Sequence, residues 1–240
     1  MPGAKYNVIY DSLKEKIEEA VYAYANMLPS EHQLVEEYDC SRNTIRRAIR
    51  QLADAGYVQS IHGKGVQIIY QKQEQAEFLL SGIESLKEAV ARNKQEYTTK
   101  VICFAELTVD ERMEQRTSFP VGTEIYYLQR VRYIEGEALI IDHNYFRRDV
   151  VKDLTPEIAE KSVYEYMEQV LGETIVTTKR KLTVEKMTEL DTKYLDMKGY
   201  NCLAVVSSHT FNADGVLFEY TQSRHRPDRF VFFDQAQRIK

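Results

Sequence analysis

The 240-residue sequence contains no tryptophan, only three cysteines and only ten glycines. Cys40, Cys103 and Cys202 lie far apart and form no CxxC pair, which argues against a disulfide framework and a structural zinc site. Reduced thiols in a cytoplasmic protein are therefore expected. In the absence of tryptophan, the seventeen tyrosines are expected to fill core and interface positions.

Long apolar runs are missing as well. No stretch of eighteen or more apolar residues occurs, so no membrane-spanning helix is expected. The first residues, MPGAKYNVIYDSLKEK, lack the apolar region of a secretory signal. A GxSxG elbow, a glycine-rich nucleotide loop and a clustered metal-ligand motif are also absent from the sequence, which removes the common sequence signals of catalysis.

Residues 1–70 predict a compact domain of three helices and a two-stranded hairpin. Apolar residues at spacings of three and four predict the first helix over residues 6–21. Ser30 and Gln33 have the spacing of a capping box, which predicts the start of a second helix in LPSEHQLVEEY. A third helix is predicted from Ser41 to about residue 55, and the strands YVQSI and VQIIY follow, joined by HGKG.

Residues 71–79, QKQEQAEFL, are polar and aperiodic, which predicts a linker to a second domain over residues 80–240. In that domain extended and helical segments alternate, and EGE and ADG predict hairpin turns, so an α+β fold around an antiparallel sheet is expected. The predicted helices cover residues 85–93, 155–172 and 188–198. The predicted strands cover residues 98–107, 124–134, 138–146, 174–187, 203–211, 216–226 and 229–234.

The stretch SRNTIRRAIRQL concentrates four arginines in a chain whose net charge is −5. On a helical wheel its apolar residues form one arc, and Arg46, Arg47 and Arg50 lie roughly opposite that arc. A solvated helix face usually mixes charge signs, whereas here arginines follow one another at i, i+4 without an intervening acid. This pattern favours an anion-binding face over the alternative of a plain solvated surface.

A short helix, a tight turn and a basic helix followed by a hairpin together predict a winged helix-turn-helix. The basic helix is expected to enter the DNA major groove, and the wing tip is expected to contact phosphate or the minor groove. The residues predicted to contact DNA are Arg42, Asn43, Thr44, Arg46 and Arg47 on the helix, with His62, Gly63, Lys64 and Gly65 on the wing.

The stretch LPSEHQLVEEYDCSRNTIRRAIRQLADAGYVQSIHGKG resembles the DNA-binding segment of the GntR family of bacterial transcription regulators. The family pattern runs roughly LPSE, SRxTVRxAL, LxxxGxV and a Gly-x-Gly wing. Asp39 stands where the family usually has glycine before the turn, and His62 stands where arginine is common. The resemblance implies a homodimer that binds a near-palindromic operator in double-stranded DNA.

The segments SGIESLKE, SVYEYMEQVLG and YTQSRHRPDRFVFFDQAQR resemble the effector-sensing domain of the HutC-type branch, whose fold is similar to chorismate lyase. Within that branch the likeness is to the trehalose operon repressors. It implies a repressor of sugar-utilisation genes that needs no cofactor. It also implies release from DNA by a phosphorylated sugar, trehalose 6-phosphate.

Several residues fit such an effector. Strand alternation places Arg130 and Arg132 on one face, about 7 Å apart, a spacing at which two guanidiniums can hold one phosphate. The predicted phosphate-binding residues are these two with Ser85 and Leu86 at a helix start, and Ser162 and Tyr164 as hydroxyl donors. The predicted sugar-binding residues are Asp142, Glu219 and His225. Arg224 faces away from them and is expected to form a structural ion pair.

Other interpretations of the second domain stay open. The paired arginines are equally compatible with a surface charge ladder matched by acids across the sheet. A regulator of the same architecture could sense another effector, such as an amino-sugar phosphate. Asp142 and Glu219 could instead be the carboxylate pair of a sugar-phosphate hydrolase, although two acids among 37 are weak support for that class.

Overall fold

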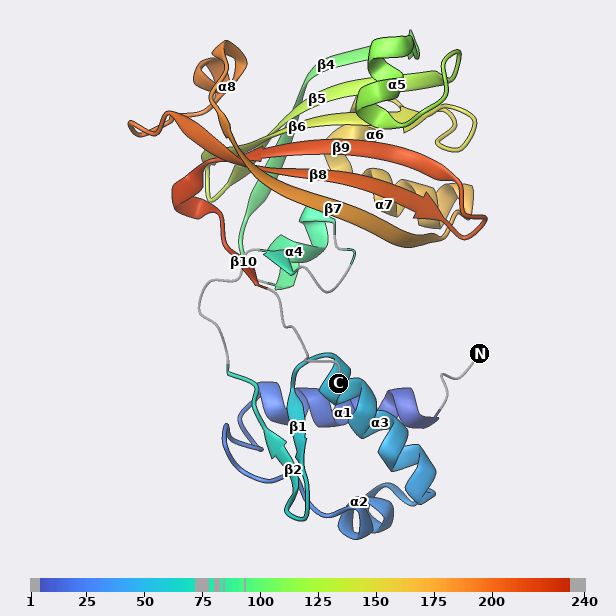
Figure 1. The fold of residues 1–240 in the computed structure, drawn as a ribbon, viewed down its shortest axis with the longest axis vertical. Helices are drawn as coiled ribbons and strands as arrows, with labels where there is room; N and C mark the ends of the chain where they lie inside the picture. The colour runs from blue at the N-terminus through green and yellow to red at the C-terminus, as the bar shows by residue number, and fades with distance from the viewer. Residues whose placement is uncertain (1–4, 72–77, 80–82, 84, 93, 234–240) are drawn as a thin grey trace. The chain divides into compact units, whose positions relative to one another are not determined.

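The computed structural model describes residues 5–71, 78–79, 83, 85–92 and 94–233. The chain divides into two compact units, which we call the N-terminal unit (Met1–Gln75 with Gln235–Lys240) and the C-terminal unit (Ala76–Asp234). Most of the predicted linker, residues 71–79, lies outside the described residues. Its last two residues, Phe78–Leu79, form strand β3 and not linker, because they pair in parallel with strand β10, Phe232–Phe233 (Figure 1).

The N-terminal unit has the predicted order of helices and strands. Its elements are α1 (Lys5–Glu18), α2 (Glu31–Tyr38), α3 (Arg42–Asp54), β1 (Val58–Ile61) and β2 (Gly65–Ile68), the two strands pairing antiparallel. Leu13, Leu34, Ile45 and Leu52 are fully buried, so all three helices contribute to one core. The first helix ends earlier than predicted: Ala20 has a φ of 59° and Val21 is 64% exposed, so the apolar spacing overestimated its length.

A six-stranded antiparallel sheet organises the C-terminal unit, with strand order β4-β5-β6-β9-β8-β7 (Figure 1). The strands are β4 (Tyr97–Thr108), β5 (Glu124–Ile134), β6 (Glu137–Arg147), β7 (Ile175–Lys186), β8 (Cys202–Asn212) and β9 (Leu217–His225). The predicted α+β class is confirmed. Glu135 and Gly136 join β5 to β6 with positive φ values of 51° and 77°, as a tight hairpin turn requires.

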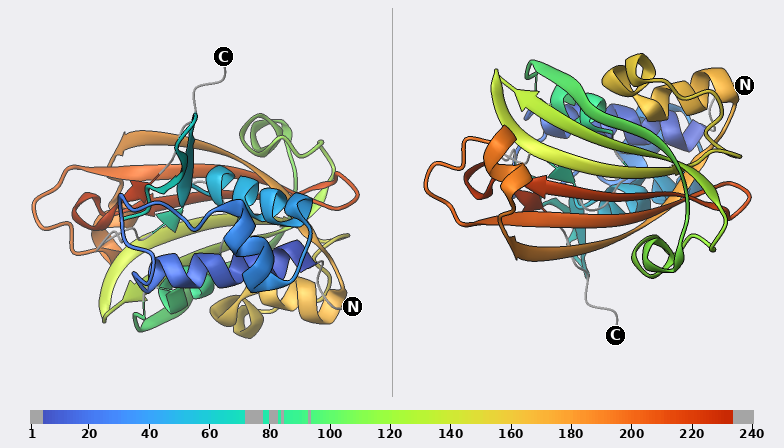
Figure 2. Two further views of the ribbon diagram at one scale, coloured as in Figure 1. Left: turned by 90° about the horizontal axis from the view of Figure 1, so that it is seen from below. Right: turned by 90° about the horizontal axis from the view of Figure 1, so that it is seen from above.

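Helices cover both faces of this sheet (Figures 1 and 2). On one face α6 and α7 pack against Tyr126, Leu128 and Phe146. The opposite face is covered by α5 and α8, and Leu190 and Tyr194 of α8 pack against the cluster that contains Val205. The helices are α4 (Leu86–Arg92), α5 (Glu111–Thr117), α6 (Pro156–Lys161), α7 (Val163–Tyr166) and α8 (Glu189–Tyr194).

Three sequence predictions in this unit were wrong in detail. The helix predicted over residues 155–172 is interrupted at Ser162, whose extended backbone (φ −150°, ψ 115°) ends α6 and caps α7, and a π-helical turn, Met167–Leu171, follows. The strand predicted over residues 229–234 shrinks to β10, because Pro227–Arg229 forms a 3₁₀ turn. Helix α5 was not predicted; its sequence signal is the N-cap Asp110, which accepts a hydrogen bond from Met113 N.

Candidate functional site

Helix α3 presents a basic face on the N-terminal unit. Ile45, Ala48, Ile49 and Leu52 are buried, as the wheel predicted, and pack toward the core. The polar side chains on the other side are exposed: Arg42, Asn43, Arg46, Arg47 and Arg50. The arginines of α3 thus form one cationic surface on a chain of net charge −5.

Two of these arginines are engaged by other helices. Arg46 Nε donates to both oxygens of Glu31 on α2, at 2.9 and 3.0 Å, so this arginine has an acidic partner although no acid lies between the arginines within the helix. Arg47 donates to the Tyr6 hydroxyl at 3.0 Å and stacks over its ring, 3.7 Å from the centroid. A helical wheel contains the residues of one helix only, whereas these partners come from α2 and α1 and could not be seen on it.

The turn between α2 and α3 sets the angle of the basic helix. Asp39 ends α2 in the left-handed region, with a φ of 45°, which shows that it adopts the conformation usually given to glycine. Ser41 caps α3: its hydroxyl accepts from Thr44 N at 3.2 Å and bonds the Thr44 hydroxyl at 2.8 Å. The predicted DNA-contacting residue Thr44 therefore also holds the helix start.

The β1–β2 connection forms an exposed wing tip. His62, Gly63, Lys64 and Gly65 are all exposed, and Lys64 N closes the turn on Ile61 O at 3.0 Å. Gly65 has a φ of 120°, and a Cβ there would lie 3.1 Å from Met27 Cε, so the turn requires glycine at this position. The exposed Lys64 is available to a phosphate.

The C-terminal unit contains a pocket on the sheet face that α4, α6 and α7 cover. The space between its walls is about 1030 Å³, a volume that includes open solvent at the mouth. We call the sheet surface at the bottom of the pocket its floor. The strand register aligns one residue from each of β5, β6, β9, β8 and β7 in a row across this surface. That row consists of Leu128, Asn144, Thr221, Ser208 and Arg180.

Two buried arginines lie at the β5 end of this floor. Arg130, Arg132 and Asp142 are only 5, 7 and 7% exposed. Arg132 Nε donates to Asp142 Oδ2 at 2.7 Å, while Arg130 Nη2 lies 3.8 Å from the same oxygen. Arg130 Nε donates instead to Asn144 Oδ1 at 2.8 Å. The alternative of a surface charge ladder does not hold, because these groups are buried.

Basic side chains outnumber acidic ones around this cluster. Burial, and after it the charge of Arg132, lowers the pKa of the Arg130 guanidinium, which nevertheless stays protonated at neutral pH. Burial raises the pKa of the Asp142 carboxyl, but Arg132, Arg130 and a hydrogen bond from Ser223 outweigh it and leave that pKa below 3.8. Asp142 bonds these cations and the charge of Glu219 also acts on Arg130, but five basic side chains line the pocket beside these two acids, a surplus that favours an added anion.

Glu219 occupies the middle of the pocket on β9. Its Oε2 accepts from the Tyr164 hydroxyl at 2.6 Å and its Oε1 accepts from the Thr221 hydroxyl at 2.7 Å. Burial and the neighbouring Glu219 carboxylate raise the pKa of Tyr164 well above 10.0, so the phenol is a hydrogen-bond donor at neutral pH. The hydrogen bond between Tyr164 and Glu219 joins α7 to the sheet.

The other predicted pocket residues lie in the same wall. His225 is buried against Phe230, and burial lowers its pKa to about 4, so its ring is neutral at neutral pH. The Ser162 hydroxyl accepts from Glu165 N at 3.2 Å, as the cap of α7. Ser85 and Leu86 line the pocket from the start of α4. The structure therefore brings all nine predicted effector residues to one cavity.

Sequence reasoning missed further lining residues: Lys87, Lys161, Asn144, Thr178, Arg180 and Ser208. Asn144 could have been predicted, because it lies two residues after Asp142 on the same strand and therefore on the same face of the sheet. Thr178, Arg180 and Ser208 required knowledge that β7 and β8 extend the same floor, which their local sequence does not carry. Lys87 Nζ bonds Glu165 at 2.7 Å and so links α4 to α7 at the pocket wall.

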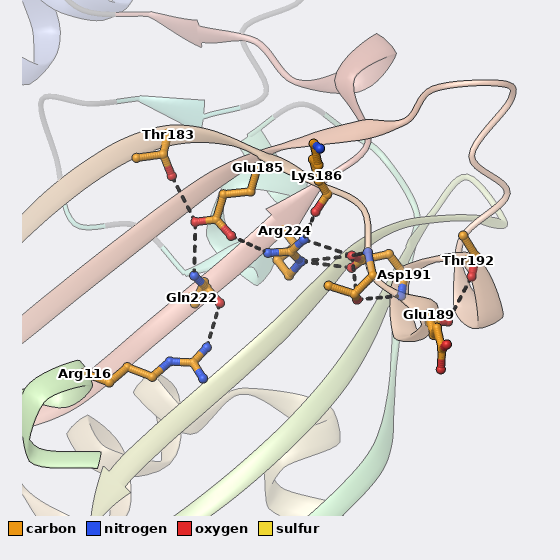
Figure 3. Close-up of polar contacts among 10 residues, drawn as sticks. Arg116, Thr183, Glu185, Lys186, Glu189, Asp191, Thr192, Gln222 and Arg224 are labelled. Atoms are coloured by element: carbon orange, nitrogen blue, oxygen red, sulfur yellow. Dashed lines mark hydrogen bonds and ion pairs between the residues drawn. The ribbon is translucent and has the colours of Figure 1, made fainter. Parts of the chain in front are cut away.

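The opposite face of the sheet holds a separate polar network (Figure 3). Arg224 donates to Asp191 on α8 at 2.9 Å and to Glu185 on β7 at 2.7 Å. Gln222 accepts from Arg116 at 2.8 Å on the same face. Arg224 thus forms the expected structural ion pair and anchors α8, away from the pocket.

Two absences among the described residues bear on other classes of function. No helix in that part of the chain combines the length and apolar character that crossing a bilayer demands. Within the same residues, no group of three or more His, Cys, Asp or Glu side chains is arranged to hold a metal ion.

Comparisons with known proteins agree with this architecture. The profile of the gntR family of bacterial regulatory proteins matches residues 5–68, and that of the UTRA domain matches residues 92–231. The chain is 38% identical over 236 residues to the HTH-type transcriptional regulator TreR of Bacillus subtilis, covering 98% of each chain.

Solved structures show the same fold. A possible transcriptional regulator of Bacillus subtilis, YydK, superposes with a TM-score of 0.81 at 24% identity, over 98% of this chain and 100% of that one. The effector binding domain of the B. subtilis trehalose repressor TreR superposes with a TM-score of 0.54 at 38% identity, over 60% of this chain and 99% of that one. The chain belongs to the gntR family of bacterial regulatory proteins and is a DNA-binding transcriptional regulator with a UTRA domain.

Proposed function

We propose that the chain is a cytoplasmic, homodimeric repressor of sugar-utilisation genes, released from its operator when a phosphorylated sugar enters the pocket. Trehalose 6-phosphate is the first candidate, because the relative TreR, at 38% identity, includes a solved domain described as that of a trehalose repressor. In this proposal residues 1–70 contact DNA, residues 71–79 connect, and residues 80–240 sense the effector.

The observation that carries the proposal is the surplus of basic side chains around Arg130 and Arg132. Both guanidiniums are buried beside Asp142, and the pocket is lined by five basic side chains and two carboxylates. A phosphate adds negative charge and offers acceptors for Arg N–H groups at the pocket face. Lys87 and Lys161 line the same pocket and strengthen its positive potential.

The sugar part of the ligand fits the polar floor beside these arginines. Hydroxyls of Thr221 and Ser223, the Asn144 amide and the Glu219 carboxylate all line the pocket. Each can exchange its present bond for one with a sugar hydroxyl. Asp142, predicted as a sugar ligand, is better suited to orient the arginines, because one oxygen accepts from Arg132 and the other from Ser223.

An amino-sugar phosphate is the second candidate. The buried Glu219 carboxylate favours it, since this group could pair with an ammonium. Catalysis by the Asp142–Glu219 pair finds no support in the geometry. A glycosidase acid needs a raised pKa, whereas that of Asp142 is lowered, and Glu219 accepts from two hydroxyls.

Release follows from linkage between the two ligands. If the effector binds the DNA-free conformation better, it weakens operator affinity by the same factor. Helix α4 is suited to transmit this change, because Ser85 and Leu86 line the pocket while Lys87 pairs with Glu165 of α7. Two recognition helices in a dimer would read half-sites about one DNA turn apart.

The test is fluorescence-anisotropy binding of the full chain to a palindromic operator duplex at fixed salt, with trehalose 6-phosphate, glucose 6-phosphate or glucosamine 6-phosphate added. Release by the disaccharide phosphate supports the proposal, while release by the amino-sugar phosphate alone replaces the effector. Arg132→Ala should hold the operator at effector concentrations that release the wild type. Normal release of that variant would refute the phosphate-binding role.

A further inference from the structure

The floor of the pocket continues well beyond the predicted phosphate site. Arg130 lies on β5 and Arg180 lies on β7, with β6, β9 and β8 between them. Neighbouring strands lie about 4.8 Å apart, so four strand spacings correspond to about 19 Å of sheet before curvature shortens it. Both arginines line the same cavity, and the floor between them is continuous.

One phosphorylated hexose covers only part of this length. With its phosphate at Arg130 and Arg132, its ring reaches the strands β6 and β9, because a pyranose ring is about one strand spacing wide. There Asn144, Thr221 and Glu219 can bind its hydroxyls. The stretch of floor on β8 and β7 then remains without a ligand group above it.

That remaining stretch has the chemistry of a neutral sugar site. Thr178, Arg180 and Ser208 supply donors, while Val206 supplies an apolar surface for a ring face. Among the described residues, the Ser208 side chain makes no hydrogen bond, whereas Thr178 shares its hydroxyl with Thr210 at 3.3 Å. The charge of Arg180 acts on the buried hydroxyl of Tyr164, the donor to Glu219, so this cation lies beside the middle of the pocket.

We propose that Thr178, Arg180 and Ser208 form a second sugar subsite, which makes the pocket selective for phosphorylated disaccharides over phosphorylated monosaccharides. This inference rests on the proposed function, because it takes the phosphate to lie at Arg130 and Arg132. The sugar nearer the phosphate binds over β6 and β9, and the second ring binds over β8 and β7. Selectivity then comes from the β8–β7 end, while the β5 end supplies affinity for any sugar phosphate.

Calorimetric titration of the full chain with trehalose 6-phosphate and with glucose 6-phosphate tests the subsite. The Thr178→Val, Ser208→Ala double variant removes two hydroxyls with little change in side-chain volume. Because the variant loses two hydrogen-bonding groups, we expect its affinity for the disaccharide phosphate to fall about tenfold or more. Its affinity for glucose 6-phosphate should stay within about twofold, which also shows that the variant is folded.

Thr183→Val is the matched control, because Thr183 lies on β7, as Thr178 does, but its hydroxyl bonds Glu185 on the face of the sheet opposite the pocket (Figure 3). It should leave both affinities unchanged. Equal affinity of the wild type for both sugar phosphates, or equal loss of both in the double variant, would overturn the subsite while the proposed function stands. Tighter binding of fructose 1,6-bisphosphate than of the disaccharide would also overturn it, by assigning Arg180 to a second phosphate. If no phosphorylated sugar binds or releases the operator, the proposed function fails as well.

Discussion

Replacing Asp142 by Asn should destabilise the C-terminal unit in a way that phosphate reverses. The substitution keeps the shape of the side chain but removes the carboxylate that Arg130 and Arg132 share at 3.8 and 2.7 Å. Breaking a buried ion pair costs about 3–5 kcal/mol, because the remaining charge is left without compensation. The amide still accepts a hydrogen bond, so we expect the lower end, about 3 kcal/mol. In a unit of this size that corresponds to a fall in Tm of about 6–12 °C.

The assay is thermal unfolding of wild type and variant with increasing inorganic phosphate at constant ionic strength. Phosphate should raise the Tm of Asp142→Asn more than that of the wild type, because the variant lacks the carboxylate that bonds Arg132 and the added anion takes its place. Asp149→Asn is the control: its partner Arg147 is 25% and Asp149 is 60% exposed, so the change should cost less than about 1 kcal/mol. A variant as stable as wild type, or one with no greater response to phosphate, would refute the role of Asp142 as the bonded counter-charge of the two arginines.

Three further predictions concern separate parts of the chain. Arg42→Ala should weaken operator binding and lower its salt slope by about one, with effector affinity unchanged, in anisotropy titrations over a salt series. The pKa of His225 falls from 6.5 to about 4 on folding, so between those pH values the unfolded chain binds a proton that the folded chain excludes. Stability, measured by urea unfolding, should therefore fall as pH drops from 6.5 toward 4, and His225→Gln should flatten this fall. Tyr164→Phe leaves the buried Glu219 with one hydroxyl donor fewer and should weaken effector binding about tenfold in calorimetry, without changing operator affinity.

The sequence predicted the basic helix well because a helical face depends on spacing alone. The buried positions Ile45, Ala48 and Leu52 are those of the predicted apolar arc. The partners of that helix could not be predicted in the same way. Glu31 reaches Arg46 from fifteen residues away, through a turn whose geometry depends on the left-handed backbone of Asp39.

The pocket shows a similar division between local and long-range information. Strand alternation correctly placed Arg130 with Arg132 on one face, and Glu219 with His225 on another strand of that face. Alternation does not specify which strands are neighbours. The order β6-β9-β8-β7 brings Arg180 to the floor that begins at Arg130, and hydrogen bonding between distant segments sets that order.

Burial makes the two arginine arrangements of this chain respond differently to salt. The α3 arginines are exposed, and charge interactions through solvent are screened beyond about 8 Å at physiological ionic strength. Arg130 and Arg132 are buried, so salt screens their attraction for an anion much less. Operator affinity should therefore fall steeply with salt, while effector affinity changes little. Linkage makes the ratio of operator affinities with and without effector equal to the ratio of effector affinities in the DNA-bound and DNA-free states. Because the effector affinities change little with salt, this ratio should stay nearly constant even as both operator affinities fall.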